Sequence, residues 1–173
     1  GYARASRSPG IAMCQSVGAA NMAAGLQDAY LGLSPVIAIS GRQTPLNRDR
    51  NAYQEIDHWP LYEPVTKYNA YVDTIEQLPQ QLRQAFREAT SGAPRPVHLE
   101  LSGFQGSDVA EVETDVEVSA EEMFTRYPAF RPEPEPERVR AAAALLADAE
   151  RPVIVAGGGA VASEAGLQIT RLA

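Results

Sequence analysis

Two side chains in the middle of the sequence could act on a small ligand. Gln54 carries an amide that could orient a carboxylate or a keto oxygen. His58 is the histidine better placed for acid–base work, because it follows the quartet Gln-Glu-Ile-Asp in a long irregular segment. A solvated Gln54 and a structural or surface His58 are the alternatives. For His98, on the polar face of an expected strand, we expect a structural role.

Several other kinds of chemistry lack the residues that they need. The sequence has two histidines and one cysteine, and it contains no HExxH or CxxC spacing, so we expect no metal site built from this chain. It also contains no GxSxG nucleophile elbow and no Walker loop. Cys14 cannot form an intrachain disulfide, and we interpret it as core filling. Without disulfides the sequence fits a reducing, cytoplasmic compartment.

A glycine-rich turn near the end of the sequence could bind a nucleotide. Gly157, Gly158 and Gly159 begin the pattern GxGxxA, which lies between an expected strand and an expected helix. The acidic residue that contacts the ribose in such sites would lie beyond Ala173. The pattern therefore leaves two alternatives open: a turn that binds FAD or another nucleotide, and a turn that binds nothing.

The elements that position these residues alternate between strand and helix. Apolar runs predict strands at 11–15, 35–41, 65–72 and 97–101. Residues 18–31 have helical spacing, and a capping-box pattern at Thr74 and Gln77 precedes a strongly amphipathic helix. Strands of this kind, with helices between them, predict an α/β fold with a doubly wound parallel sheet. We expect this first domain to span residues 1–108.

The remainder of the sequence differs in composition. Residues 109–137, which end in the alternating run RPEPEPE, are expected to be an acidic interdomain linker. Residues 138–173 predict the start of a second α/β domain, with a helix at 138–149, a strand at 152–157 and a helix from about 163. No basic stripe suits nucleic acid, and no apolar run is long enough for a membrane span. The first residues lack an initiator Met and a signal-peptide pattern, so we expect the chain to be part of a longer protein.

Five motifs resemble, in order, the thiamine-diphosphate-dependent enzymes of the acetolactate synthase and pyruvate oxidase group. They are GYARASRSPGIAMCQSVGAAN, PVIAISGRQ, QEID, PVTKY and SGAPRPVHLEL. The resemblance implies a pyrimidine-binding domain that is incomplete at its N-terminus, followed by the first helix-strand-helix of a Rossmann-like central domain. One departure is that Ser16-Val17-Gly18 stands where the family usually has Gly-Pro-Gly.

The resemblance also implies site residues. Gly18, Asn21 and Gln54 would lie beside the thiamine diphosphate, with Gly18 allowing a tight turn and a close approach of the backbone to the ligand. Asn21 could instead cap the following helix. Lys67 could take part in the substrate channel, although a surface lysine is the ordinary alternative. The family's catalytic glutamate would precede Gly1. The Gly-Asp-Gly motif that binds Mg²⁺ and diphosphate does not occur in this sequence.

The resemblance finally implies a function for the full-length protein. That function is decarboxylation of a 2-keto acid with carboligation, as in acetolactate synthase, with thiamine diphosphate and Mg²⁺ and with FAD as an option. A homodimer or homotetramer would form the active site at its subunit interface. The present chain alone is expected to be inactive. The alternatives are a thiamine-diphosphate-dependent decarboxylase of another 2-oxo acid or of an acyl-CoA, and a non-catalytic nucleotide-binding module.

Overall fold

The computed structural model divides the chain into two compact units, Gly1–Ala129 and Phe130–Ala173. It describes residues 1–173, except for the side chain of Gln105. Each unit is considered by itself below. No helix in the described part of the chain is both long enough and apolar enough to cross a membrane.

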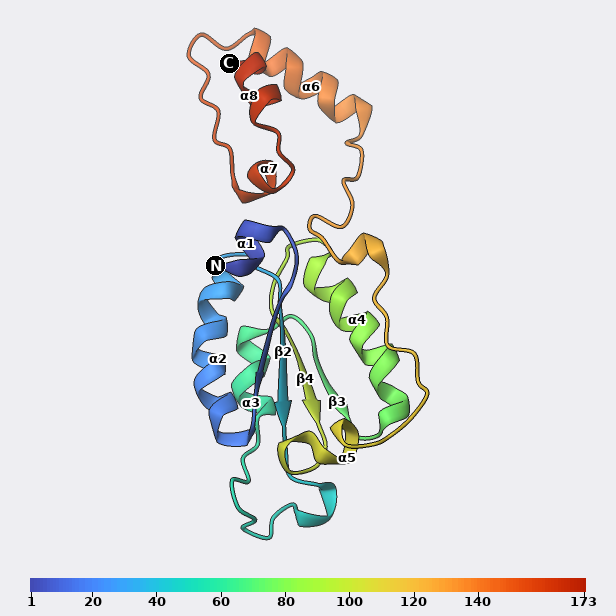
Figure 1. Ribbon diagram of the computed structural model, residues 1–173. Helices are drawn as coiled ribbons and strands as arrows, with labels where there is room; N and C mark the ends of the chain where they lie inside the picture. The colour runs from blue at the N-terminus through green and yellow to red at the C-terminus, as the bar shows by residue number, and fades with distance from the viewer. The chain divides into compact units, whose positions relative to one another are not determined.

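The first unit is built on a four-stranded parallel sheet (Figure 1). Its strands are β1 (Gly10–Cys14), β2 (Val36–Gly41), β3 (Asn69–Val72) and β4 (Val97–Leu101), in the spatial order β1-β2-β4-β3. The three neighbouring pairs are all parallel. Every residue of β4 is buried, as expected for a central strand with both faces covered. The predicted parallel α/β sheet is therefore confirmed.

Helices cover the two faces of this sheet (Figure 1). Helix α2 (Ser16–Leu31) packs Ala19, Ala23 and Leu26 in a cluster with Ala38 of β2. Helix α4 (Leu78–Thr90) packs Ala85 and Ala89 in another cluster, with Ile37 of β2 and with residues of β3 and β4. Since successive residues of a strand point to opposite faces, Ile37 and Ala38 mark the two layers of the core. The shorter helices of the unit are α1 (Tyr2–Ser6), α3 (Trp59–Tyr62) and α5 (Ser107–Ala110).

Two element boundaries in the first unit differ from the predicted ones by two residues or more. Helix α2 begins at Ser16 with Gln15 as its N-cap, so the alternative that Asn21 caps this helix is wrong. Strand β3 begins only at Asn69, because the 3-10 turn Glu63–Val65 occupies the start of the predicted strand. The capping box of Thr74 and Gln77 is confirmed, and it opens a 3-10 turn that leads into α4.

The acidic segment is divided between the two units. Its first part, up to Ala129, packs on the sheet unit: Val109 of α5 is buried in the core, and Glu121 forms an ion pair with Arg87 of α4. The second unit contains α6 (Pro136–Ala147), α7 (Gly158–Ala162) and α8 (Gly166–Leu172). The strand predicted at 152–157 does not form. A strand requires a hydrogen-bonded neighbour, and Val153 and Val155 are 85% and 89% exposed.

A buried histidine joins β2, β3 and β4. His98 on β4 is 1% exposed, and its ring stacks on that of Tyr62 with centroids 3.6 Å apart. Its Nδ1 lies 2.5 Å from Asn69 Oδ1, and its Nε2 lies 2.7 Å from Ser40 Oγ. One ring nitrogen can donate while the other accepts, so the neutral ring satisfies both contacts. Burial, helped by the nearby charge of His58, lowers the pKa of His98 to about 3.

We predict that His98 makes the fold sensitive to acid. In the unfolded chain the histidine takes up a proton near pH 6.5, whereas in the fold it stays neutral down to about pH 3, so this stability is present above pH 6.5 and lost below it. His98→Gln cannot take up that proton. Between pH 7 and pH 5, the wild type should therefore lose about 2 kcal/mol of unfolding free energy relative to the variant. Urea denaturation of both chains at the two pH values measures this, and an unchanged difference would contradict it.

Candidate functional site

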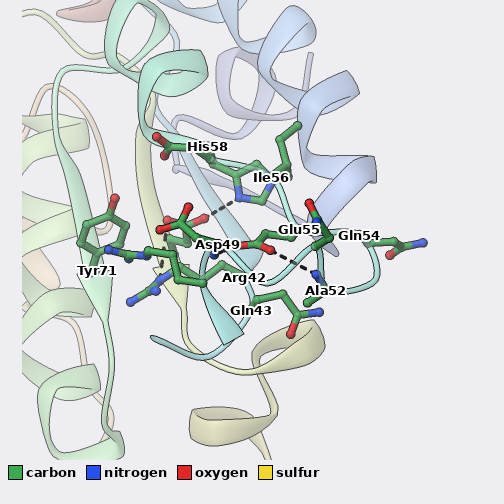
Figure 2. Close-up of a pocket in the computed structure, with 13 residues that line it drawn as sticks. Arg42, Gln43, Asp49, Ala52, Gln54, Glu55, Ile56, His58 and Tyr71 are labelled. Carbon is green, nitrogen blue, oxygen red and sulfur yellow. Dashed lines mark hydrogen bonds and ion pairs between the residues drawn. The ribbon is translucent and has the colours of Figure 1, made fainter. Parts of the chain in front are cut away.

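A cavity of about 590 Å³ lies at the carboxyl ends of β2, β3 and β4 (Figure 2). Ligands of open α/β sheets bind at this edge, where the loops that follow parallel strands meet. Most of the wall comes from the loop 42–58, and Tyr71 and Glu100 complete it from β3 and β4. The loop residues that line the cavity are Arg42, Gln43, Arg48, Asp49, Asn51, Ala52, Gln54, Glu55, Ile56, Asp57 and His58.

The backbone of the loop 42–58 is strained at three residues, and the carboxylate of Glu55 holds it in place. Asp49, Asn51 and Gln54 all have positive φ, between 52° and 61°. Such angles cost non-glycine residues about 1–3 kcal/mol each and cluster at functional sites. The Glu55 carboxylate accepts hydrogen bonds from the backbone N–H groups of Asp49 at 2.7 Å and of Ala52 at 3.2 Å. Glu55 is therefore committed to holding the turn.

Gln54 has an unused hydrogen-bonding atom beside the cavity. Its Nε2 donates to the hydroxyl of Tyr53 at 3.1 Å. Its Oε1 is buried and has no hydrogen-bond partner among the side chains and backbone that the structure describes. A buried acceptor without a donor costs about 1–3 kcal/mol, so it is suited to an N–H or O–H group of a ligand. Within the predicted quartet, Gln54 is the residue that keeps a buried polar atom without a partner among the described residues.

His58 is not placed to transfer a proton to a ligand, because both of its ring nitrogens are bonded within the protein. Its side chain is completely buried, and its Nδ1 bonds to a carboxylate oxygen of Glu100 (Figure 2). Its Nε2 lies 2.7 Å from the carbonyl oxygen of Ser16. Both partners offer acceptor oxygens, so the geometry favours a ring that donates from both nitrogens, which is the imidazolium form. Burial opposes this charge, but the bonds to Glu100 and Ser16 outweigh it and raise the pKa of His58.

The carboxylate of Glu100 also faces a second cation, Arg42. Its Oε2 lies 3.9 Å from Arg42 Nε, and Arg42 pairs on its other side with Asp73. The guanidinium lies over the ring of Tyr71, 4.6 Å from the centroid. Arg42 and Glu100 were not among the site residues predicted from the sequence. Glu100 could have been found, because it is a charged residue in a mainly apolar central strand. A buried charge requires a partner, and this requirement points to a cation such as Arg42.

The other residues predicted for the site lie at two different ends of the sheet. Helix α2 begins at the cavity's edge, where Ser16 Oγ donates to the carbonyl of Gly41 at 3.1 Å. Gly18 and the exposed Asn21 follow in the first two turns of this helix. The structure does not bring Lys67 to the cavity. Its Nζ donates to the carbonyls of Ser91 and Ala93 at the amino ends of β3 and β4.

Gly18 does not make the turn that the sequence predicted for it. It is the third residue of α2, so the change from strand to helix is complete before it. A Cβ atom at Gly18 would lie 3.6 Å from the Cβ of Cys14, which is an ordinary contact. The packing of this chain therefore does not require glycine here.

The structure gives no metal site and no enclosed nucleotide site within the described residues. No group of three or more His, Cys, Asp or Glu side chains in that part of the chain could hold a metal ion. In the second unit, Gly157 is the N-cap of α7, and Cβ atoms added at Gly157, Gly158 or Gly159 would meet nothing within 4 Å. The predicted nucleotide turn leads into α7, as expected, and Gly158 and Gly159 are the first two residues of that helix.

Comparison with known proteins connects this geometry to a family. Residues 1–61 match the model described as thiamine pyrophosphate enzyme, N-terminal TPP binding domain. The chain is 39% identical over 176 residues to the probable acetolactate synthase large subunit of Methanocaldococcus jannaschii, which covers 100% of the chain and 29% of that protein. It is 36% identical over 162 residues to acetolactate synthase isozyme 1 large subunit of Escherichia coli, covering 93% of the chain and 28% of that protein.

A plant relative extends the same pattern. The chloroplastic acetolactate synthase of Arabidopsis thaliana is 30% identical over 168 residues, which cover 94% of the chain and 24% of the relative. The chain thus spans less than a third of the length of these relatives. The parallel sheet, the family model and the matches along nearly the whole chain show that it belongs to the thiamine-diphosphate-dependent enzymes.

Proposed function

We propose that the full-length protein is a thiamine-diphosphate-dependent enzyme that decarboxylates a 2-keto acid and ligates the remaining carbon unit, as an acetolactate synthase does. The single structural observation that carries this is the unpaired Gln54 Oε1 beside a cavity at the carboxyl edge of the sheet. The relatives named acetolactate synthase support the substrate class. A thiamine-diphosphate-dependent decarboxylase of another 2-oxo acid is the alternative.

This chain would provide one wall of the site. Bound thiamine diphosphate supplies a carbon nucleophile for the keto group and takes up the electron pair that decarboxylation releases. Gln54 would accept a hydrogen bond from a ligand N–H or O–H group, which fixes the ligand's orientation. The backbone beside Gly18 would allow close approach, and the loop 42–58 would keep water out. Fixed polar groups of this kind need not reorganise during the reaction.

The remaining parts of the site would come from outside this chain. Mg²⁺ prefers carboxylate and carbonyl ligands around a diphosphate, and the sequence contains no Gly-Asp-Gly motif. We therefore propose that the metal and the diphosphate bind to another part of the full-length protein. We also propose a homodimer or homotetramer in which that part comes from a second subunit. FAD is a further ligand to test, because a glycine turn precedes α7.

Thermal unfolding of the full-length protein tests the proposal. Ligands that bind the folded state raise the melting temperature. Thiamine diphosphate with Mg²⁺ should raise it, and addition of pyruvate should yield carbon dioxide and an acetolactate-type product. FAD is titrated separately. A shift with FAD but none with thiamine diphosphate would favour a nucleotide-binding module and reject the proposal. A shift with thiamine diphosphate but release of a free aldehyde would favour the alternative decarboxylase.

We predict that Gln54→Ala lowers kcat/KM for the keto acid about tenfold in the full-length enzyme. The variant loses one hydrogen bond of about 1.4 kcal/mol. Gln27→Ala is the matched control, because Gln27 is an exposed glutamine on α2. It should leave kcat/KM unchanged. Equal values for wild type and Gln54→Ala would show that Gln54 does not contact the reacting ligand.

We predict that Gly18→Ala changes stability and binding in opposite directions. Alanine is favoured over glycine in a helix by up to about 1 kcal/mol, and the space beside Gly18 accepts a Cβ atom. The variant should therefore unfold at higher urea concentration but bind thiamine diphosphate at least about tenfold more weakly in the full-length enzyme. Gly25→Ala, where a Cβ atom meets nothing within 4 Å, should stabilise the helix without loss of binding. Unchanged cofactor binding in Gly18→Ala would remove Gly18 from the site.

A further inference from the structure

Both ends of the loop 42–58 are attached to the same carboxylate (Figure 2). Arg42, the first residue after β2, approaches one oxygen of Glu100, and His58, the last residue before α3, bonds to the other. The side chains of Arg42 and Glu100 are 8% and 3% exposed, and that of His58 is completely buried. Glu100 thus closes the loop that carries Gln54 and most of the cavity wall.

The closure also extends to a third element through His58. Its second nitrogen bonds to the carbonyl of Ser16, in the first turn of α2. The end of the loop is therefore fixed between β4 and α2. In the sequence, His58 lies 42 residues from Glu100 and 42 residues from Ser16. Gln54 lies four residues before this point. Its positive φ of 59° leaves its backbone in a conformation that the surrounding structure must maintain.

The closure depends on a proton. A neutral imidazole has one N–H, so it could satisfy Glu100 or the Ser16 carbonyl, but not both. The unsatisfied acceptor would remain without water, because His58 is completely buried. The titratable and charged groups that face this ring are Glu100 and His98 from β4, Asp57 from the loop, Arg42 after β2 and Tyr62 from α3.

We propose that His58 is a positioning residue: its protonated ring, held between Glu100 and Ser16, keeps the loop 42–58 closed and directs the Gln54 amide at the ligand. This inference deepens the proposed function and rests on it. The closed loop is present below the titration of His58, and it is lost as the pH rises through that titration. The affinity of the enzyme for its ligand therefore falls on the alkaline side.

The wild-type chain contains its own reporter for this titration. Trp59 is the only tryptophan, it follows His58 directly, and its ring lies 5.0 Å from that of Tyr71. Its fluorescence should change in one step above pH 6.5, and nitrogen NMR should show both ring nitrogens of His58 protonated on the acid side of that step. The His58→Gln chain should show no such step. His98 does not interfere, because its pKa is about 3. A His58 ring that is mainly neutral at pH 6.5 in the folded wild type would overturn the proposal.

Kinetics of the full-length enzyme separate positioning from simple stabilisation. His58→Gln should raise KM about tenfold and abolish the rise of KM that accompanies the titration of His58 above pH 6.5, with little change in kcat. If His58 acts through Gln54, the double variant His58→Gln, Gln54→Ala should be no worse than Gln54→Ala alone. His98→Gln is the control for loss of a buried histidine, and its effect should add to that of Gln54→Ala.

The outcomes distinguish this inference from the proposed function. Additive effects of His58→Gln and Gln54→Ala on kcat/KM would overturn the positioning role, even in an enzyme that binds thiamine diphosphate. If the full-length protein binds no thiamine diphosphate, the proposed function fails, and the NMR and fluorescence results still decide whether His58 is protonated and closes the loop. Glu100→Gln provides a second variant: it should remove the fluorescence step while keeping the size of the buried side chain.

Discussion

The fold must accommodate a carboxylate buried near the end of its central strand. Glu100 is 2% exposed, and both of its neighbours in β4 are apolar residues of the core. A buried charge without partners is very costly, and removing one member of a buried ion pair destabilises a protein by about 3–5 kcal/mol. Arg42 and His58 provide the compensation, and they lie at the two ends of one loop. The conformation of that loop, and with it the wall of the cavity, follows from the need to neutralise Glu100.

The need to neutralise Glu100 also gives the two histidines different protonation states. His58 faces two acceptors, which favours its protonated ring, whereas the partners of His98 are satisfied by a neutral ring. Tyr62 contacts both rings, stacked on His98 and edge-on to His58. The charge on His58 lowers the pKa of His98 further, because a second buried cation nearby would be unfavourable. Environment rather than residue type thus decides which histidine carries the proton.

Local signals were sufficient to predict much of the fold. Apolar strands with helices between them predicted the parallel sheet, and Thr74 with Gln77 predicted the capping box. Each depends on residues that are close in sequence. The pairing of His58 with Glu100 joins residues 42 positions apart, and no local pattern encodes it. The family resemblance implied that Lys67 could take part in the substrate channel, and only the packing of β3 against β4 reveals that it bonds to carbonyls at the opposite edge.

Buried polar atoms without a hydrogen-bond partner occur both at the cavity and away from it. Their surroundings distinguish side chains with a structural role from side chains that could bind a ligand. Four buried side-chain atoms lack a hydrogen-bond partner within the part of the chain that the structure describes, in Arg42, Gln54, Asn69 and Arg95. Arg95 stacks on Tyr30, and Asn69 already bonds to His98, so both side chains have a structural role. Arg42 and Gln54 line the cavity, and the first offers a donor while the second offers an acceptor. The loop that Glu100 closes therefore presents complementary hydrogen-bonding groups at the edge where parallel sheets bind their ligands.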